Sequence, residues 1–223
     1  MRALLIANSD DADPGFVGQR LRHHGFAFTE CHRERPDEWP DLAGHDLVLM
    51  LGSEWSVYWP HVALSVAAEA ALVRAAQARG VPQLGICFGN QIMAHALGGT
   101  VERARTPEIG WYQVVTDEPQ AIAQGPWFEW HSDVVTLPPG AHELARTSVG
   151  PQAWRLGRSF CTQFHPEVNE SVVARWTSGS GAVEVTDFGH SIEQLIDETR
   201  RNVQISREHT DALVDWFLAT VAV

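Results

Sequence analysis

The sequence predicts an α/β protein with a doubly wound, mostly parallel central sheet and helices on both of its faces. Short, nearly continuous apolar runs bounded by polar residues or glycine are typical of parallel strands that are covered on both faces. The first part of the chain contains three such runs, which are RALLIA (2–7), DLVLML (46–51) and VPQLGI (81–86). Helix-like stretches separate these runs, and strands that alternate with helices favour a parallel sheet.

Two of the helix-like stretches precede the third apolar run. The first, GFVGQRLRHHG, is closed by Gly25. The second, HVALSVAAEAALVRAAQARG, is rich in alanine and ends at Gly80, as helices commonly end at glycine. A further helix is expected from about Gly89 to Leu97.

Beyond Gly99 the pattern changes to shorter β-like runs, GWYQVV, DVVTL and SFCTQF, which predict a small antiparallel section. A C-terminal helix is expected around SREHTDALVDWFLATV (206–221), and residues 177–190 are interpreted as a loop or lid. Because no repeat or linker-like tract interrupts the chain, we expect residues 1–223 to form a single domain.

The composition excludes several functional classes. With 28 acidic and 16 basic residues the net charge is −12, so the long-range field repels nucleic acids and anionic membranes. The three cysteines show no paired spacing, which argues against a disulfide framework or a zinc site. The apolar start is too short for a signal peptide, and no run approaches the roughly 18 residues of a membrane span. We therefore expect a cytoplasmic protein that needs no metal or cofactor.

The stretch GICFG (85–89) places a cysteine between two glycines, after a predicted strand and before a predicted helix. This context is typical of a nucleophile elbow, in which a sharp turn projects the nucleophile above the sheet. Glycines on either side remove the side chains that would clash at such a turn. The N-terminal end of the following helix favours the thiolate, so Cys87 is the candidate nucleophile.

A cysteine nucleophile needs a base and a group that orients the base, and QFHPEV (163–168) offers both. His165 and Glu167 are two residues apart in a segment that Pro166 keeps extended, so both side chains can lie on the same side. We therefore expect Glu167 to hold the imidazole of His165, which exchanges protons with Cys87. Cys31 and Cys161 lack flanking glycines and are interpreted as structural.

With these motifs in place, the sequence resembles the class I, triad-type glutamine amidotransferases, in a stand-alone form similar to the amidotransferase domain of GMP synthase. The resemblance covers nearly the whole chain and rests on GICFGNQ, FHPEV, the loop LGSEWSV, EIGWY (108–112) and WHSD (130–133). It implies a flavodoxin-like fold. It also implies hydrolysis of the glutamine side-chain amide through a γ-glutamyl thioester on Cys87, with release of glutamate and ammonia.

The same resemblance implies roles for further residues. The oxyanion of the thioester-forming step needs backbone donors, which are expected at Phe88 and in the loop at Gly52 and Ser53. Gln91 is expected to contact the bound glutamine. The backbone near Ser132 and Asp133 is expected to hold its α-amino end.

The sequence departs from the family at two places. The oxyanion loop commonly reads GGP, whereas GSE stands at residues 52–54, so Ser53 restricts the backbone and Glu54 replaces a rigid proline. Such a loop is expected to become competent when a partner docks. Asn90 stands where many members carry histidine, with little expected effect on the chemistry.

Two alternatives to a glutamine amidotransferase remain open. A γ-glutamyl hydrolase would use the same thioester on γ-glutamyl amines or peptides, and Trp55, Trp59 and Trp130 could shape its larger pocket. A non-catalytic homologue would act as a binding or regulatory module. If the chain is an amidotransferase, its ammonia acceptor must be a separate synthetase, because no phosphate-cradling loop is present.

Overall fold

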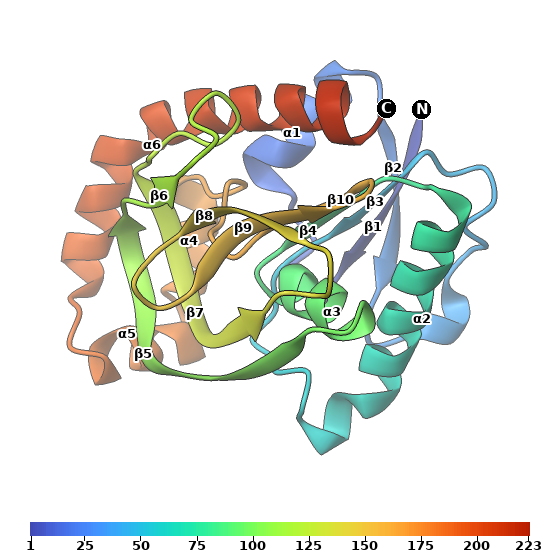
Figure 1. Ribbon diagram of the computed structural model, residues 1–223. Coiled ribbons are helices and arrows are strands. Elements are labelled where there is room, and N and C mark those ends of the chain that lie inside the picture. The colour runs from blue at the N-terminus through green and yellow to red at the C-terminus, as the bar shows by residue number, and fades with distance from the viewer.

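The structure is a computed structural model that describes residues 1–223 as two β-sheets surrounded by helices (Figure 1). The main sheet has eight strands in the order β2-β1-β3-β4-β10-β9-β8-β6. The five strands from β2 to β10 in this order are parallel, and β9, β8 and β6 continue the sheet in antiparallel pairs. Strands β5 and β7 form a separate antiparallel sheet. This arrangement confirms the predicted fold class.

The parallel strands are β1 (Arg2–Ala7), β2 (Ala27–His32), β3 (Leu47–Met50), β4 (Gln83–Ile86) and β10 (Ser159–Thr162). The antiparallel strands are β5 (Thr100–Tyr112), β6 (Val115–Thr116), β7 (Trp127–Thr136), β8 (His142–Arg146) and β9 (Pro151–Leu156). The helices are α1 (Gly15–His23), α2 (Ala63–Arg79), α3 (Phe88–Ala96), α4 (Glu170–Trp176), α5 (Ser180–Asp187) and α6 (Ile192–Trp216). Short 3₁₀ turns lie at Pro36–Glu38 and Pro60–Val62, and a π turn covers Phe217–Val221.

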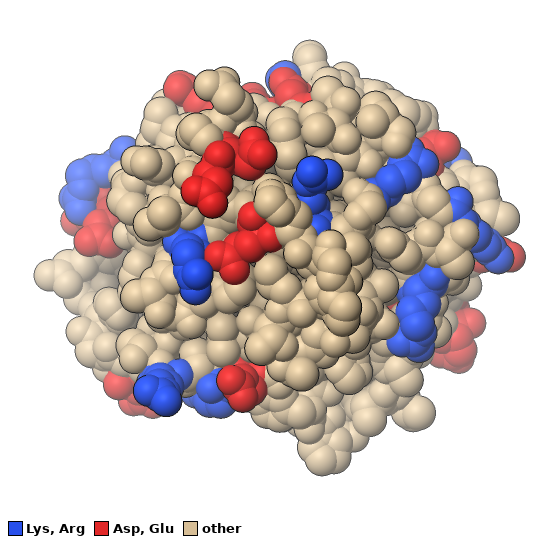
Figure 2. Space-filling view, in the orientation of Figure 1, with Lys and Arg blue, Asp and Glu red and all other residues tan.

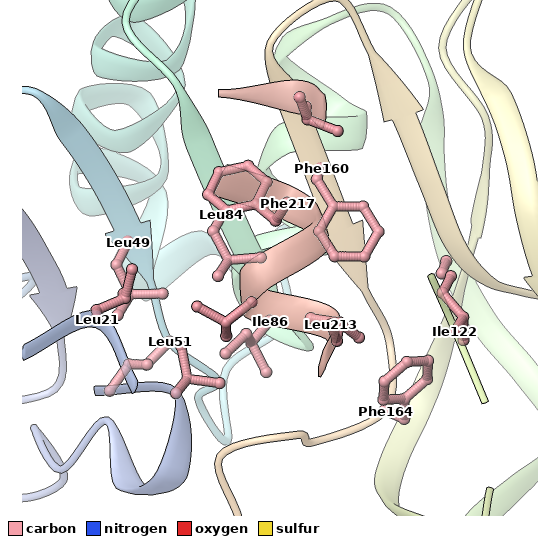
Figure 3. Packing of buried hydrophobic residues seen from close by; sticks show 14 of the residues in the cluster. Leu21, Leu49, Leu51, Leu84, Ile86, Ile122, Phe160, Phe164, Leu213 and Phe217 are labelled. Carbon is pink, nitrogen blue, oxygen red and sulfur yellow. The ribbon is translucent and has the colours of Figure 1, made fainter. Parts of the chain in front are cut away.

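Helices α1 and α6 cover one face of the main sheet, and α2 and α3 cover the other (Figure 1). The sheet strands alternate between two apolar clusters, one against each helical layer, which is why their sequences are apolar throughout. In the first cluster Phe217 from the C-terminal segment packs beside Leu84 and Phe160 of neighbouring strands (Figure 3). The inner strands β3, β4 and β10 are therefore buried on both faces.

Parallel pairing brings segments that are distant in the sequence to one edge of the sheet. Strands β4 and β10 are neighbours, with Ile86 paired to Thr162, and the N–H of Cys87 donates to the Thr162 carbonyl (2.8 Å). The loops that follow β1 and β3 leave the sheet at the same edge. In open α/β sheets this carboxyl edge is where ligands bind.

The interpretation of residues 177–190 as a loop is wrong, because residues 180–187 form α5. The serine and glycine content suggested a loop, but tertiary packing stabilises this short helix. Val185 is fully buried in a third apolar cluster, and Glu184 accepts a hydrogen bond from Trp130 Nε1 (2.8 Å).

The C-terminal helix begins 14 residues before the expected range, at Ile192. Small polar residues occupy much of its buried face, so that the apolar period is weak there. Thr199 accepts a hydrogen bond from Trp111 Nε1 (3.1 Å), and Thr210 donates to the Pro166 carbonyl (2.6 Å). The helix thus also anchors the segment that carries His165.

The surface carries acidic and basic side chains interspersed with wide uncharged areas on the face drawn in Figure 2. This face therefore shows no extended basic patch of the kind that phosphate backbones bind. Among the helices, none combines the length and apolarity needed to cross a membrane.

The two glycines around Cys87 are required by close packing, and this requirement can be tested with Gly89→Ala. A Cβ at Gly89 would lie 2.3 Å from the Met50 carbonyl oxygen, so α3 would have to move away from β3. We expect Gly89→Ala to lower the free energy of unfolding by about 3 kcal/mol, measured by urea denaturation. Gly25→Ala is the control, because a Cβ there meets nothing within 4 Å and only the positive φ costs energy, about 1 kcal/mol. Equal losses in both variants would contradict this explanation.

Candidate active site

Cys87 sits on the sharp turn between β4 and α3. Its backbone has φ 51° and ψ −104°, and it is the only non-glycine residue with positive φ. A conformation of this kind costs on the order of 1–3 kcal/mol and is concentrated at functional sites. On the two sides of the turn, Gly85 lies against Gly89 and Met93, and Gly89 lies against Met50. The local sequence therefore folds into the predicted elbow.

His165 and Glu167 come from the segment that follows β10. The N–H of His165 donates to the Phe128 carbonyl (2.8 Å), which fixes the backbone beside β7. The imidazole Nδ1 lies 2.7 Å from Glu167 Oε1, and both side chains are buried. The Nε2 atom is also buried and has no hydrogen-bond partner, so it is available to a reacting group.

The imidazole of His165 and the side chain of Cys87 converge above Gly52. A Cβ at Gly52 would lie 3.1 Å from His165 Cε1 and 3.5 Å from Cys87 Cβ. Burial alone would lower the pKa of His165, but Glu167 and Cys87 outweigh it and raise this pKa well above its ordinary value. The raised pKa favours the protonated imidazole, the form that can donate to a leaving group.

The other two cysteines lie away from this turn. Both Cys31 and Cys161 are buried in strands of the main sheet. Burial raises the pKa of Cys31 to about 11 and that of Cys161 well above its ordinary value. Their thiols are thus kept protonated and unreactive near neutral pH.

A cavity of about 460 Å³ opens at the carboxyl edge of the sheet and holds most of the predicted site residues. Eight of the nine line it: Gly52, Ser53, Cys87, Gln91, Ser132, Asp133, His165 and Glu167. The ninth, Phe88, is fully buried and does not line the cavity. The tryptophans predicted at the rim also line the cavity: Trp55, Trp59 and Trp130.

Two predicted substrate contacts have unpaired polar atoms. Gln91 Oε1 and Ser132 Oγ are buried without a hydrogen-bond partner, and buried polar atoms are rarely left so in a folded protein. The carboxylate of Asp133, by contrast, accepts hydrogen bonds from Ser56 Oγ (2.6 Å) and Tyr58 OH (2.8 Å). Gln91 and Ser132 are thus free to bind a ligand, whereas the Asp133 side chain is already occupied.

Asn90, which departs from the family pattern, is buried and forms hydrogen bonds with other side chains of the protein. Its side chain donates to Gln163 Oε1 (2.8 Å) and accepts from Trp154 Nε1 (2.6 Å). Both contacts are buried and face away from the cavity lining. Asn90 therefore ties α3 to the antiparallel side of the main sheet.

A buried charged cluster, of which His131 lines the cavity, was not assigned a role from the sequence. It consists of Glu108, Glu129 and His131, which lie in or beside the EIGWY and WHSD motifs. His131 Nε2 is 3.1 Å from Glu108 Oε2 and 3.4 Å from Glu129 Oε2, while Nδ1 lies 2.9 Å from the Asp133 carbonyl oxygen. Motif membership was the available signal, but it did not show that these side chains meet.

The three residues carry atoms of the kind that bind metals, all within 4.8 Å of one another. Glu108 Oε2 already accepts from Thr147 Oγ1 (3.0 Å) and Gln152 Nε2 (2.8 Å) besides its contact with His131. Burial would lower the pKa of His131, but Glu108 and Glu129 raise it to about 10. The attraction between a protonated His131 and the two carboxylates therefore explains why these three side chains lie together without a metal ion.

The fold and the site together define a class of protein. A parallel α/β sheet carries a cysteine on a strained strand-to-helix turn, and a histidine–glutamate pair lies beside it at the carboxyl edge. This arrangement suits nucleophilic attack on an acyl group.

The chain belongs to the class-I glutamine amidotransferase family, whose model matches residues 21–174. It is similar to the "GMP synthase [glutamine-hydrolyzing]" of Aquifex aeolicus, with 28% identity over 91% of the chain, and to that of Limosilactobacillus reuteri, with 30% identity over 84%. A solved structure of a glutamine amidotransferase from Thermotoga maritima superimposes with a TM-score of 0.86, at 25% identity and 99% coverage of both chains.

The chain spans only part of its curated relatives. It covers 41% of the Aquifex aeolicus protein and 38% of the Limosilactobacillus reuteri protein. A protein from Saccharolobus solfataricus that is named as one subunit of a glutamine-hydrolysing GMP synthase is 36% identical over 41% of the chain, and 53% of that protein is covered. The similarity to GMP synthases therefore concerns their amidotransferase portion.

The charged cluster predicts that stability depends on pH. The pKa of His131 lies near 10 in the folded protein, above the ordinary value of 6.5. Its stabilising effect is fully present below pH 6.5 and is lost as the pH rises through 10. We expect the free energy of unfolding to fall between about pH 7 and 10, and to fall less steeply in Glu108→Gln.

Urea denaturation at a series of pH values measures this dependence. Glu102→Gln is the matched control, since Glu102 is an exposed residue of the same strand and its loss should leave the slope unchanged. If Glu108→Gln and the parent protein showed the same slope, His131 would not be the titrating group.

Proposed function

We propose that this protein is a glutamine amidotransferase in which Cys87, His165 and Glu167 hydrolyse the side-chain amide of glutamine. The thiolate of Cys87 attacks the amide carbon, and His165 protonates the departing ammonia. A γ-glutamyl thioester remains on Cys87, and His165 then activates a water molecule that cleaves it to glutamate. Glu167 holds the imidazole in one tautomer and stabilises its charge.

One observation carries the proposal most directly: the strained elbow at Cys87 faces the His165–Glu167 pair. Strain is retained only where the surrounding structure enforces it, and here it projects a cysteine into a lined cavity. Family membership favours glutamine as the substrate. The free polar atoms of Gln91 and Ser132 are suited to bind its polar groups.

We further propose that residues 1–223 act as one amidotransferase domain whose ammonia passes to a separate synthetase. The support is the similarity to the Saccharolobus solfataricus protein, whose name as one subunit of a GMP synthase implies that another completes the enzyme. A cytoplasmic location is consistent with this role. The net charge of −12 argues against a nucleic-acid partner.

A γ-glutamyl hydrolase is the second candidate, and the cavity is the observation that favours it. Its volume of about 460 Å³ falls in the range of sites for drug-sized ligands, roughly 300–1,000 Å³. Trp55, Trp59, Trp130 and Trp176 line it and offer flat apolar surface for a larger leaving group. A kcat/KM higher for γ-glutamyl amines than for glutamine would favour this candidate.

The proposal is tested by incubating the purified protein with glutamine and measuring glutamate and ammonia. Turnover, alone or with a candidate synthetase, is expected. A folded sample that releases neither product under both conditions would refute the amidotransferase assignment. Rapid labelling of Cys87 by a glutamine-like electrophile would argue further against a purely regulatory homologue.

Substitutions separate the expected roles of the three residues. Cys87→Ala should lower kcat by on the order of 10⁶-fold, because the group that forms the thioester is lost. Glu167→Gln should cost less, on the order of 10⁴-fold, because the imidazole loses its orienting charge but remains. Steady-state kinetics measure both effects. Cys31→Ala is the control and should keep kcat, and a comparable loss there would contradict the assignment of Cys87.

A further inference from the structure

Arg33 is a fully buried cation just beyond the end of β2. A buried guanidinium is costly unless hydrogen bonds and an opposite charge compensate it. Its Nε atom lies 3.4 Å from Oε1 of Glu69, a residue of α2 that is also fully buried. The other two nitrogens are not used for this ion pair and donate to the loop that follows β3 and to the end of β1.

The guanidinium holds two successive peptide groups of that loop. Nη2 donates to the Leu51 carbonyl (3.0 Å), and Nη1 donates to the Gly52 carbonyl (2.9 Å). Nη1 also donates to Asn8 Oδ1 (3.1 Å) at the end of β1. A planar fork with fixed donor directions imposes one orientation on both peptides, which a lysine cannot do.

The orientation of these carbonyls determines where the N–H groups point. In a trans peptide the C=O and the following N–H point in opposite directions. Because the Leu51 and Gly52 carbonyls face Arg33, the N–H groups of Gly52 and Ser53 point away from it. Neither N–H donates to a backbone carbonyl.

The opposite side of this loop lies against the reacting groups. The Cβ position of Gly52 is 3.5 Å from Cys87 Cβ and 3.1 Å from His165 Cε1. The same guanidinium also lies 4.8 Å from the ring centroid of Phe88, whose N–H directly follows the nucleophile. One side chain therefore contacts both segments that are expected to supply oxyanion donors.

We propose that Arg33 is a positioning residue that presets the oxyanion hole by orienting the peptides at Leu51 and Gly52. This proposal rests on the proposed cysteine chemistry. Hydrogen bonds from Arg33 would take the place of the second glycine and the proline that the GSE loop lacks. They fix the loop conformation that those two residues favour in other members of the family. With Arg33 in place, the hole does not need a partner protein for its assembly.

The first test compares Arg33→Lys and Arg33→Met with the parent protein in glutamine hydrolysis. Loss of an oriented donor costs on the order of 10²- to 10³-fold in kcat. We expect kcat to fall by about 10²-fold in Arg33→Lys and at least as much in Arg33→Met, with KM changed less than about threefold. Arg35→Lys is the matched control, since Arg35 is an exposed neighbour paired with Glu38, and it should keep kcat.

The second test separates a positioning role from a general loss of structure. Acylation of Cys87 by p-nitrophenyl acetate passes through an oxyanion as the sulfur gains the acetyl group and p-nitrophenolate leaves. Alkylation by iodoacetamide displaces iodide and forms no oxyanion. We expect the Arg33 variants to slow acylation by about 10²-fold and to leave alkylation unchanged. Mass spectrometry of the Cys87 peptide follows both reactions.

The outcomes distinguish the two proposals. If the parent protein acylates Cys87 but does not hydrolyse glutamine, the glutamine assignment fails while the comparison of Arg33 variants still decides this proposal. Acylation and alkylation slowed by the same factor, or acylation unchanged, would overturn it. Failure of the parent protein to acylate Cys87 would overturn it as well. Should Arg33→Met fail to fold by circular dichroism, Arg33→Lys carries the same comparison.

Discussion

The pairing of β4 with β10 is the constraint on which the rest of the site depends. The two strands are parallel neighbours, so the chain leaves both at the same edge of the sheet, and Cys87 and His165 follow within three residues of the strand ends. Although the two residues are 78 positions apart in the sequence, both therefore line the same cavity. A cysteine on a strained turn gains nothing from exposure alone. Cys87 can act as a nucleophile because the segment after the neighbouring strand places the imidazole of His165 beside it.

Several contacts hold the residues of the site in place. Glu167 orients the imidazole, and Thr210 on α6 holds the intervening Pro166 carbonyl. The side chains of Glu108 on β5 and of Glu129 and His131 on β7 form a buried cluster, and His131 contacts the carbonyl of Asp133. These contacts come from four different parts of the chain. Preorganisation of this kind lets polar groups act without moving at the moment of reaction.

Much of the fold and the nucleophile could be predicted from the sequence, because each depends on local chemistry. Apolar runs report strands that are buried on both faces, and the glycines around Cys87 report a turn without room for side chains. Arg33 could not be predicted in the same way. A charged residue after a strand is usually solvated, and only the tertiary fold shows that its partners are backbone carbonyls and Glu69. Helix α5 was missed for a related reason, since its stability comes from Val185 and Glu184 meeting distant residues.

Helix α6 has a consequence for how the boundaries of this family are understood. The family's sequence pattern matches residues 21–174, which leaves out β1, the strand between β2 and β3, and all of α6. A fragment cut to the matched range would lose an interior strand of the sheet, uncover one apolar face and release the Pro166 carbonyl between the histidine and the glutamate. In this protein the range that matches the family pattern is therefore shorter than the range needed for a complete sheet and a covered core.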